Sequence, residues 1–390
     1  RCVMKKFIAV LMCILTLLTF VACTPDLPSP DNTGDSTTTT TTTTATSSPE
    51  EIELAKIAEL TEYLSAVDYN NFEVTEADKP YFMGRWFEKE INGEAHMVTV
   101  TDGSLFYFLV EGAESVDVNF TKITTTEVMP KFAYSIDGGT PVRQDITNPT
   151  VTLPDKGKHT VRIIADCMKE SEDKWVGEKG FALKSVTTSA GGSLWGIKPK
   201  DKVIFFYGDS ITEGIFALGS TQDRNSATNA YPWHCSEKLG TVPYSIGYGG
   251  SGITVDGSFK TLINAIDYNS KDRLVADGIT PDIIVIAHGT NERTTNPQIL
   301  EADLKVAIAR LQEKFPNVPI VYLIPSNSHM TKGGNIKRAV NTFQNTYIVE
   351  TKDWGVTFTD SCHPNAAGAK IMGEKFADAL IGIFGADFFN

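Results

Sequence analysis

Ser210 lies in a polar turn, GDSITEG at residues 208–214, that directly follows the aromatic run FFY at 205–207. A turn of this kind can cap the next helix, or it can present a serine as a nucleophile. A nucleophilic serine needs a base, and His363 is the best candidate because imidazole exchanges protons near neutral pH. Asp360 precedes His363 in the segment DSCH and could fix the imidazole tautomer and stabilise its protonated form.

Acyl transfer also needs hydrogen-bond donors for the oxyanion that develops on the substrate carbonyl. The backbone N–H groups of Ser210 and Gly250 and the side-chain amide of Asn291 could supply them. Glycine suits a position where the backbone must approach a substrate closely. Taken singly, each of these residues has a structural explanation as a turn or a helix cap. Their combination favours catalysis only if the fold brings them together.

Residues 196–390 alternate between apolar runs and helix-length segments, which predicts a parallel sheet covered by helices on both faces. Active sites in such sheets lie beyond the carboxyl ends of the strands. The polar clusters at 208–210, 247–254, 288–292 and 360–368 follow the first, second, third and fifth expected strands. The expected strands are 203–207, 244–246, 282–287, 320–324 and 356–359, and the expected helices are 226–239, 257–267, 297–314, 334–351 and 365–383.

The preceding segment, 76–195, has a different pattern, with short strand-like runs separated by turn residues such as TDG, DGG and PDKG. This spacing predicts an antiparallel β-sandwich. The expected strands lie at 96–100, 104–110, 115–120, 131–137, 150–154, 159–165 and 180–188. With 390 residues and 41% hydrophobic composition, two folded units are expected at roughly 100–200 residues per domain.

The first 75 residues read as targeting and connecting segments. Residues 1–23 combine Met4, Lys5 and Lys6 with an apolar stretch, as in a secretory signal, and TFVAC resembles a bacterial lipobox with Cys23 as the lipidated residue. Ordinary cleavage nearby and an uncleaved anchor are the alternatives, and all three export the protein. Residues 24–50 form a Pro/Ser/Thr-rich linker with almost nothing to bury, and 51–75 begin with a short amphipathic helix.

Charge and cysteine content narrow the possible partners. The formal net charge is −13, from 48 acidic and 35 basic residues, so neither nucleic acid nor an anionic lipid surface is an expected partner. Membrane contact is expected only through an N-terminal anchor. Outside the leader, Cys167, Cys235 and Cys362 allow at most one disulfide, whose pairing the sequence leaves open. No CxxC pair and no metal-ligand spacing of histidines occurs, so neither a metal nor another cofactor is expected.

The four polar clusters resemble the SGNH, or GDSL-type, hydrolase superfamily over roughly 200–383. GDSITEG is similar to its first block, GYGGSG to its second, GTNE to its third and DSCH to its D-x-x-H block. The resemblance implies a flavodoxin-like five-stranded parallel sheet and a cofactor-free Ser-His-Asp ester hydrolase. It implies Ser210 as nucleophile, and Gly250 and Asn291 as oxyanion donors, with Gly249 or Gly252 as alternatives to Gly250.

The β-rich segment before this domain resembles the jelly-roll-like domain of carbohydrate esterase family two, as do residues 157–183 and HPNAAG at 363–368. Members of that family deacetylate polysaccharides such as xylan and mannan, many with a dyad that lacks the aspartate. We therefore expect an exported polysaccharide acetylesterase, in which Trp233 could stack on a sugar or pack in the core. The alternatives are an esterase for lipid, sialic acid or O-acetylated peptidoglycan, and a non-catalytic carbohydrate-binding lipoprotein.

Overall fold

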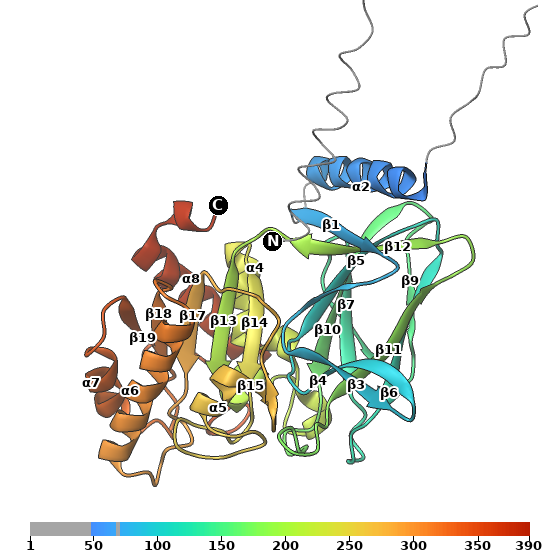
Figure 1. Ribbon diagram of the computed structural model, residues 1–390. Helices are drawn as coiled ribbons and strands as arrows, with labels where there is room; N and C mark the ends of the chain where they lie inside the picture. The colour runs from blue at the N-terminus through green and yellow to red at the C-terminus, as the bar shows by residue number, and fades with distance from the viewer. Residues whose placement is uncertain (1–47, 68–70) are drawn as a thin grey trace, which may run out of the picture. The chain divides into compact units, whose positions relative to one another are not determined.

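The computed structural model of the chain describes residues 48–67 and 71–390 (Figure 1). Within it, Glu50–Asn390 form one compact unit. The expected leader, Cys23 and nearly all of the 24–50 linker lie outside the described residues, so these assignments stay predictions. The domain boundaries expected near residues 75 and 195 also stay predictions. In the described part of the chain, no helix is long and apolar enough to cross a membrane.

The segment from Phe72 to Pro199 folds into two antiparallel sheets, as the turn spacing predicts. One sheet has the order β1-β12-β5-β10-β7-β8, with β2 also pairing with β5, and the other has the order β3-β4-β11-β6-β9. The strands are β1 (Phe72–Ala77), β2 (Tyr81–Met83), β3 (Trp86–Ile91), β4 (Glu94–Thr99), β5 (Leu105–Glu111), β6 (Ser115–Lys122), β7 (Lys131–Ile136), β8 (Val142–Asp145), β9 (Thr150–Thr152), β10 (Lys158–Cys167), β11 (Phe181–Thr188) and β12 (Ser193–Pro199).

Alternating side chains of the two sheets fill the space between them. Phe106 and Phe108 of β5 pack there with Val118 of β6 and Phe181 of β11, all of them fully or almost fully buried. All seven strands expected from the sequence are present. The sequence missed β1, β2, β3, β8 and β12. Three of these, β1, β3 and β8, lie at sheet edges, where charged side chains are common and the apolar alternation is weaker.

The chain then forms a five-stranded parallel sheet in the order β14-β13-β17-β18-β19, which is the flavodoxin-like 2-1-3-4-5 order. The expected fold class is therefore confirmed. The strand order reverses beside β13, so the crevice beyond the carboxyl ends of β13 and β17 is where such a fold binds ligands. The strands are β13 (Val203–Gly208), β14 (Val242–Gly247), β17 (Ile283–Ala287), β18 (Ile320–Ile324) and β19 (Thr346–Glu350).

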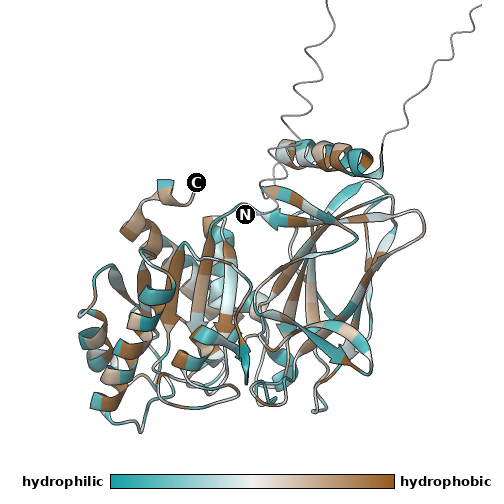
Figure 2. Ribbon diagram, in the orientation of Figure 1, coloured by the Kyte–Doolittle hydropathy of each residue, from teal (hydrophilic) through white to brown (hydrophobic). Residues whose placement is uncertain are grey.

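Helices cover both faces of this sheet, because its strands are apolar on both sides; β13, β17 and β18 are predominantly brown in Figure 2. Ile204 and Phe206 of β13 pack with α4 (Tyr231–Leu239) and α8 (Ala366–Phe384). Phe205 and Tyr207 belong to the cluster on the other face. That cluster includes residues of α5 (Leu262–Asp267), α6 (Pro297–Lys314) and α7 (Gly333–Val340).

The last strand differs from the sequence-based expectation. Residues 356–359 do not form a strand of the sheet, and Phe358 makes only an isolated bridge with Pro364. The fifth strand is β19, within the segment expected to continue a helix. Helix α7 ends at Val340, and the chain turns at Asn345, whose φ is 57°. Because β19 is an edge strand with only Val349 buried, its apolar pattern was mistaken for the end of a helix.

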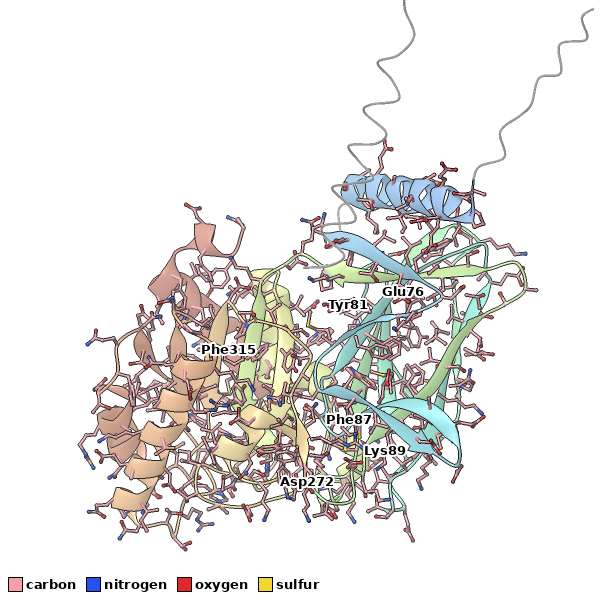
Figure 3. The ribbon with its side chains drawn as sticks, in the orientation of Figure 1. Glu76, Tyr81, Phe87, Lys89, Asp272 and Phe315 are labelled. Atoms are coloured by element: carbon pink, nitrogen blue, oxygen red, sulfur yellow. The ribbon has the colours of Figure 1, made fainter. Side chains whose placement is uncertain are left out.

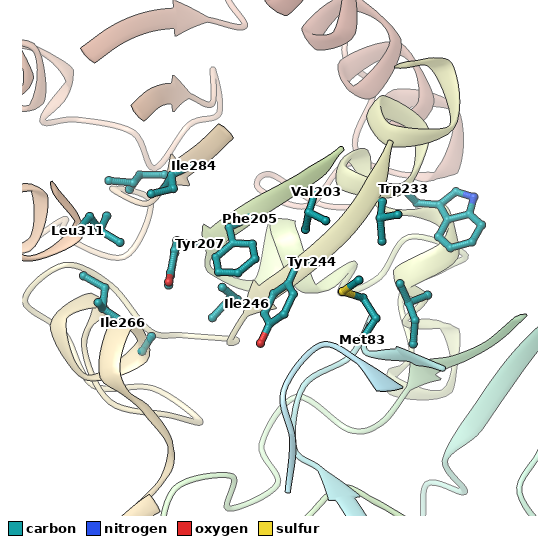
Figure 4. Close-up of a cluster of buried hydrophobic side chains, with 14 of the residues drawn as sticks. Met83, Val203, Phe205, Tyr207, Trp233, Tyr244, Ile246, Ile266, Ile284 and Leu311 are labelled. Carbon is teal, nitrogen blue, oxygen red and sulfur yellow. The ribbon is translucent and has the colours of Figure 1, made fainter. Parts of the chain in front are cut away.

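A single cluster of buried side chains joins the β-sandwich to the parallel sheet (Figure 4). Met83 of β2 belongs to it together with Val203, Phe205 and Tyr244 of the sheet. Helix α2 (Pro49–Ala66), the amphipathic helix expected from the sequence, contributes Leu60 and Leu64.

Polar contacts reinforce this boundary beside β3, where Figure 3 labels Phe87 and Lys89. The guanidinium of Arg273 lies 4.8 Å from the ring centroid of Phe87. Glu178 accepts a hydrogen bond from Arg273 Nε and pairs with Lys89 at 2.5 Å. The sandwich and the parallel sheet therefore share both apolar and charged contacts.

Candidate active site

Ser210 begins the short helix α3 (Ser210–Glu213) directly after β13, so the sheet presents it at the carboxyl edge. Asp209 caps this helix, with its Oδ1 accepting a hydrogen bond from Ile211 N at 3.0 Å. Glycine is favoured at 208, because an added Cβ would lie 1.9 Å from the hydroxyl oxygen of Thr212 and would force that side chain to shift. The tight GDS turn thus follows from local packing, and Ser210 is only 3% exposed.

His363 and Asp360 meet Ser210 in the order that a catalytic triad requires. The Nε2 atom of His363 lies 2.8 Å from Ser210 Oγ, and its Nδ1 atom lies 2.8 Å from Asp360 Oδ2. With the proton on Nδ1, held by the carboxylate, Nε2 is free to accept the serine proton. The roles of these three residues stay proposals, but their side chains are within hydrogen-bond reach of one another.

The Asp360 carboxylate is itself fixed by the backbone that follows it. Its Oδ1 accepts hydrogen bonds from Cys362 N at 2.7 Å and from His363 N at 2.6 Å. Burial alone would raise the pKa of Asp360, but the hydrogen bonds from His363 and Cys362 lower it below its usual value. Asp360 is therefore an anion at neutral pH and can stabilise a protonated His363.

Phe216 is a site residue that the sequence did not point to. Its ring packs edge-on against the imidazole of His363, with centroids 5.3 Å apart and an interplanar angle of 85°. Its backbone has a φ of 57°, which is rare for a bulky residue. Asn225 Oδ1 accepts from Phe216 N at 3.0 Å, and Thr359 Oγ1 donates to Phe216 O at 2.8 Å. These two bonds hold a strained residue against the imidazole.

The expected oxyanion residues lie in loops that contact each other. Asn291 Nδ2 donates a hydrogen bond to Ser251 O at 2.8 Å, and the adjacent Gly250 has a φ of +71°, which favours glycine. Gly249 N donates to Glu213 Oε2 at 2.6 Å, and Gly252 N donates to Val255 O at 2.8 Å. Since these two N–H groups are already engaged, the geometry favours Gly250 among the three glycines.

Two buried carboxylates lie behind the serine. Glu292 accepts hydrogen bonds from the backbone N–H groups of Ile253 and Thr254 and so supports the second polar loop. Burial raises the pKa of Asp209 to about 7, and the nearby charge of Glu292 contributes to the rise. The sequence did not reveal the supporting roles of Glu292 or of Glu213, because both depend on contacts between distant loops.

Trp233 lies in α4 and is 6% exposed. It belongs to the cluster shown in Figure 4, and the guanidinium of Arg162 lies 4.4 Å from its ring centroid. Sugar stacking by Trp233 stays a prediction, and this burial does not favour it.

The cysteines outside the leader form no disulfide in the structure. Cys167, Cys235 and Cys362 are all buried and free, so the one disulfide that the sequence allowed does not form among them. Over residues 48–67 and 71–390, no group of His, Cys, Asp or Glu side chains is arranged to hold a metal ion.

Part of the chain matches a known protein family. Residues 206–371 match the family model of the GDSL-like lipase/acylhydrolase family. No curated protein matches the sequence. The matched segment contains the Ser210, Gly250, Asn291 and Asp360 loops described above.

Solved structures match over the sandwich and the parallel sheet together. A family-two carbohydrate esterase from Clostridium thermocellum, in complex with cellohexaose, has a TM-score of 0.64 and 19% identity, covering 79% of this chain and 100% of its own. The family-two carbohydrate esterase from Cellvibrio japonicus has a TM-score of 0.61 and 18% identity, and the match covers 82% of this chain and 99% of that one. An acetyl xylan esterase from the rumen bacterium Butyrivibrio proteoclasticus has a TM-score of 0.60 and 14% identity, and the match covers 82% of this chain and 100% of that one.

At these identities the structural matches establish the fold, and the family match establishes the hydrolase domain. Both confirm the resemblance inferred from the four motifs. Residues 206–371 thus form a hydrolase segment that matches the GDSL-like lipase/acylhydrolase family model, and the chain has the two-part fold seen in the family-two carbohydrate esterases.

Proposed function

We propose that this protein is a serine esterase that removes O-acetyl groups from a polysaccharide. The observation that carries the proposal is the continuous contact from Ser210 Oγ through His363 to Asp360, at the carboxyl edge of the parallel sheet. This contact supports the proposed roles of Ser210 as nucleophile, His363 as base and Asp360 as orienting carboxylate.

In this mechanism Ser210 Oγ attacks the acetyl carbonyl while His363 Nε2 takes its proton. The backbone N–H groups of Ser210 and Gly250 and the amide of Asn291 bind the oxyanion. The tetrahedral intermediate then collapses, and protonated His363 gives its proton to the departing sugar oxygen. A water molecule, deprotonated by His363, attacks the acetyl–Ser210 ester and releases acetate.

The choice of a carbohydrate ester rests on the structural relatives. One of them binds cellohexaose and another is an acetyl xylan esterase, and they cover 79% and 82% of this chain. We therefore propose an acetylated xylan or mannan as the substrate class. The relatives support this choice through fold similarity alone.

Export belongs to the same proposal, because an extracellular polysaccharide is reached only outside the cell. We propose that the protein is anchored through a lipid on Cys23, which rests on the sequence of the leader. Replacing Cys23 by alanine should move the protein from the membrane fraction to the soluble fraction. A Cys23→Ala variant that stays in the membrane fraction would contradict the lipid anchor.

The function is tested in two steps. Hydrolysis of 4-nitrophenyl acetate by the parent and by Ser210→Ala tests the catalytic claim, which fails if the two are equally active. Acetate release is then measured from acetylated xylan, acetylated mannan and O-acetylated peptidoglycan. Release from peptidoglycan alone would replace the proposed substrate class.

A further inference from the structure

A fully buried ion pair links the β-sandwich to the catalytic helix. Lys174 lies in the loop between β10 and β11, and its Nζ donates to Glu213 Oε1. Glu213 ends α3, the helix that Ser210 begins. Both side chains are 0% exposed. The two charges therefore compensate each other away from solvent, just behind the nucleophile.

The burial of this pair needs an explanation beyond stability. Apolar side chains of similar size often stabilise a protein as well as a buried ion pair does, because desolvating two charges is costly. A second acid, Asp102, lies nearby, and burial together with the charge of Glu213 raises its pKa well above the usual range. Burial also raises the pKa of Glu213, and the ion pair and hydrogen bond with Lys174 oppose that rise. These observations favour a role for the pair in holding neighbouring groups in place.

The second carboxylate oxygen of Glu213 binds the loop that contains Gly249 and Gly250. Glu213 Oε2 accepts a hydrogen bond from Gly249 N at 2.6 Å. The carbonyl oxygen of Gly249 accepts from Ser258 N at 2.9 Å, and Ser258 O accepts from Lys174 N at 3.3 Å. Lys174 therefore holds Gly249 from two sides, through its side chain by way of Glu213 and through its backbone by way of Ser258.

These bonds fix the orientation of the next N–H group. The peptide between Gly249 and Gly250 is planar and trans, so Gly250 N–H points opposite to the Gly249 carbonyl. Since that carbonyl is directed at Ser258, Gly250 N–H is directed away from it. The neighbouring residue Tyr248 also contacts the sandwich: its ring centroid lies 5.8 Å from Lys174 Nζ, and its hydroxyl lies 2.9 Å from Thr101 Oγ1.

We propose that Lys174 of the β-sandwich is a positioning residue for the hydrolase reaction, acting through Glu213 to orient the Gly249–Gly250 peptide that would bind the oxyanion. This inference rests on the proposed function. It gives the sandwich a part in turnover, because the residue that orients the loop comes from outside the parallel-sheet segment. Lys174 itself touches no reacting atom.

The test uses the full chain with 4-nitrophenyl acetate. Lys174→Met should lower kcat by roughly 10- to 100-fold, because misplaced oxyanion donors lose transition-state binding. The KM should stay within about threefold, since the ground-state carbonyl needs those donors less. Arg162→Met is the matched control, because Arg162 also joins the sandwich to the parallel-sheet segment, through Glu237, but contacts no part of the loop. Its kcat should stay near that of the parent.

Two double variants separate positioning from stability. Lys174→Met with Glu213→Gln removes the stranded charge but keeps an acceptor for Gly249 N, so kcat should recover toward the parent. Lys174→Met with Glu213→Leu also removes the charge but leaves no acceptor, so kcat should stay low. Thermal melts confirm that the compared proteins are folded.

The outcomes distinguish the two proposals. If the parent lacks Ser210-dependent hydrolysis, the proposed function fails. If the parent is active but folded Lys174→Met keeps its kcat within twofold, the positioning inference alone is overturned. Equal kcat values for the glutamine and leucine double variants would also overturn it, including when Lys174→Met by itself does not fold.

Discussion

The sharpest test of the triad compares asparagine and alanine at position 360. Asp360 Oδ1 accepts two backbone N–H bonds and Oδ2 accepts from His363 Nδ1. Asparagine can keep the backbone bonds through its oxygen, but its amide then donates toward Nδ1. This forces the proton onto Nε2, which faces Ser210 and can no longer act as a base. Alanine removes the backbone acceptor and leaves the imidazole free to adopt either tautomer.

We expect asparagine to cost more activity than alanine, and alanine to cost more stability than asparagine. In serine proteases the asparagine change lowers kcat by about 10⁴. The Asp360 side chain is 39% exposed, so water competes with it and we expect a smaller loss. That loss should be roughly 10²–10³-fold, or about 3–4 kcal/mol in activation free energy. Asp360→Ala should lose roughly 10- to 100-fold in kcat, yet it should be less stable by about 1–2 kcal/mol because two backbone N–H groups lose their acceptor.

The assay is kcat/KM for 4-nitrophenyl acetate, measured together with urea unfolding for both variants. Asp360→Asn should be the more stable protein and the poorer enzyme. An asparagine variant as active as the alanine variant, or more active, would refute the tautomer argument. Nearly full activity in both would mean that His363 works without Asp360, as in a dyad.

Three further changes test the surroundings of the triad. Asp209, with its pKa raised from 3.8 to about 7, keeps in the native state a proton that the unfolded chain loses, so stability should fall by up to about 4 kcal/mol as pH rises from 4 to 7. Asp209→Asn should abolish that fall in urea unfolding, and an unchanged pH slope would contradict the assignment. Gly208→Ala should destabilise the protein by about 1–3 kcal/mol in the same assay, because its Cβ meets Thr212 Oγ1, and adding Thr212→Ala should restore part of the loss. Phe216→Ala should lower kcat/KM by roughly 2- to 12-fold through the lost edge contact with His363, and an unchanged value would exclude a positioning role for the ring.

The sequence predicted the elements whose signals are local. Strands such as β13 and β18 are short continuous apolar runs, and helix α6 begins and ends where its periodicity does. Asp360 and His363 could be paired because their spacing lets one short turn join them. The convergence of Ser210 with His363 followed from a rule of topology, since polar clusters after parallel strands share one edge, although the strand that precedes His363 is β19 and not the expected 356–359.

What escaped prediction depends on contacts between distant segments. Lys174 and Glu213 are unremarkable in sequence, and their importance follows only from their complete burial together. The left-handed conformation of Phe216 has no composition signal, because phenylalanine rarely adopts it. The edge strand β19 was missed because only one of its residues is buried, which leaves little apolar alternation to detect.

The shared hydrophobic cluster has a consequence for how the protein melts. Leu60 of α2, Trp195 of β12, Tyr244 of β14 and Leu300 of α6 all belong to it. Neither half can be opened without exposing apolar surface of the other, so we expect heating to disrupt both halves in one cooperative transition. An isolated fragment that starts after Pro199 would expose the apolar side chains around Val203 and Tyr244 that pack against Met83 of the sandwich, and we expect it to aggregate rather than work as a minimal enzyme.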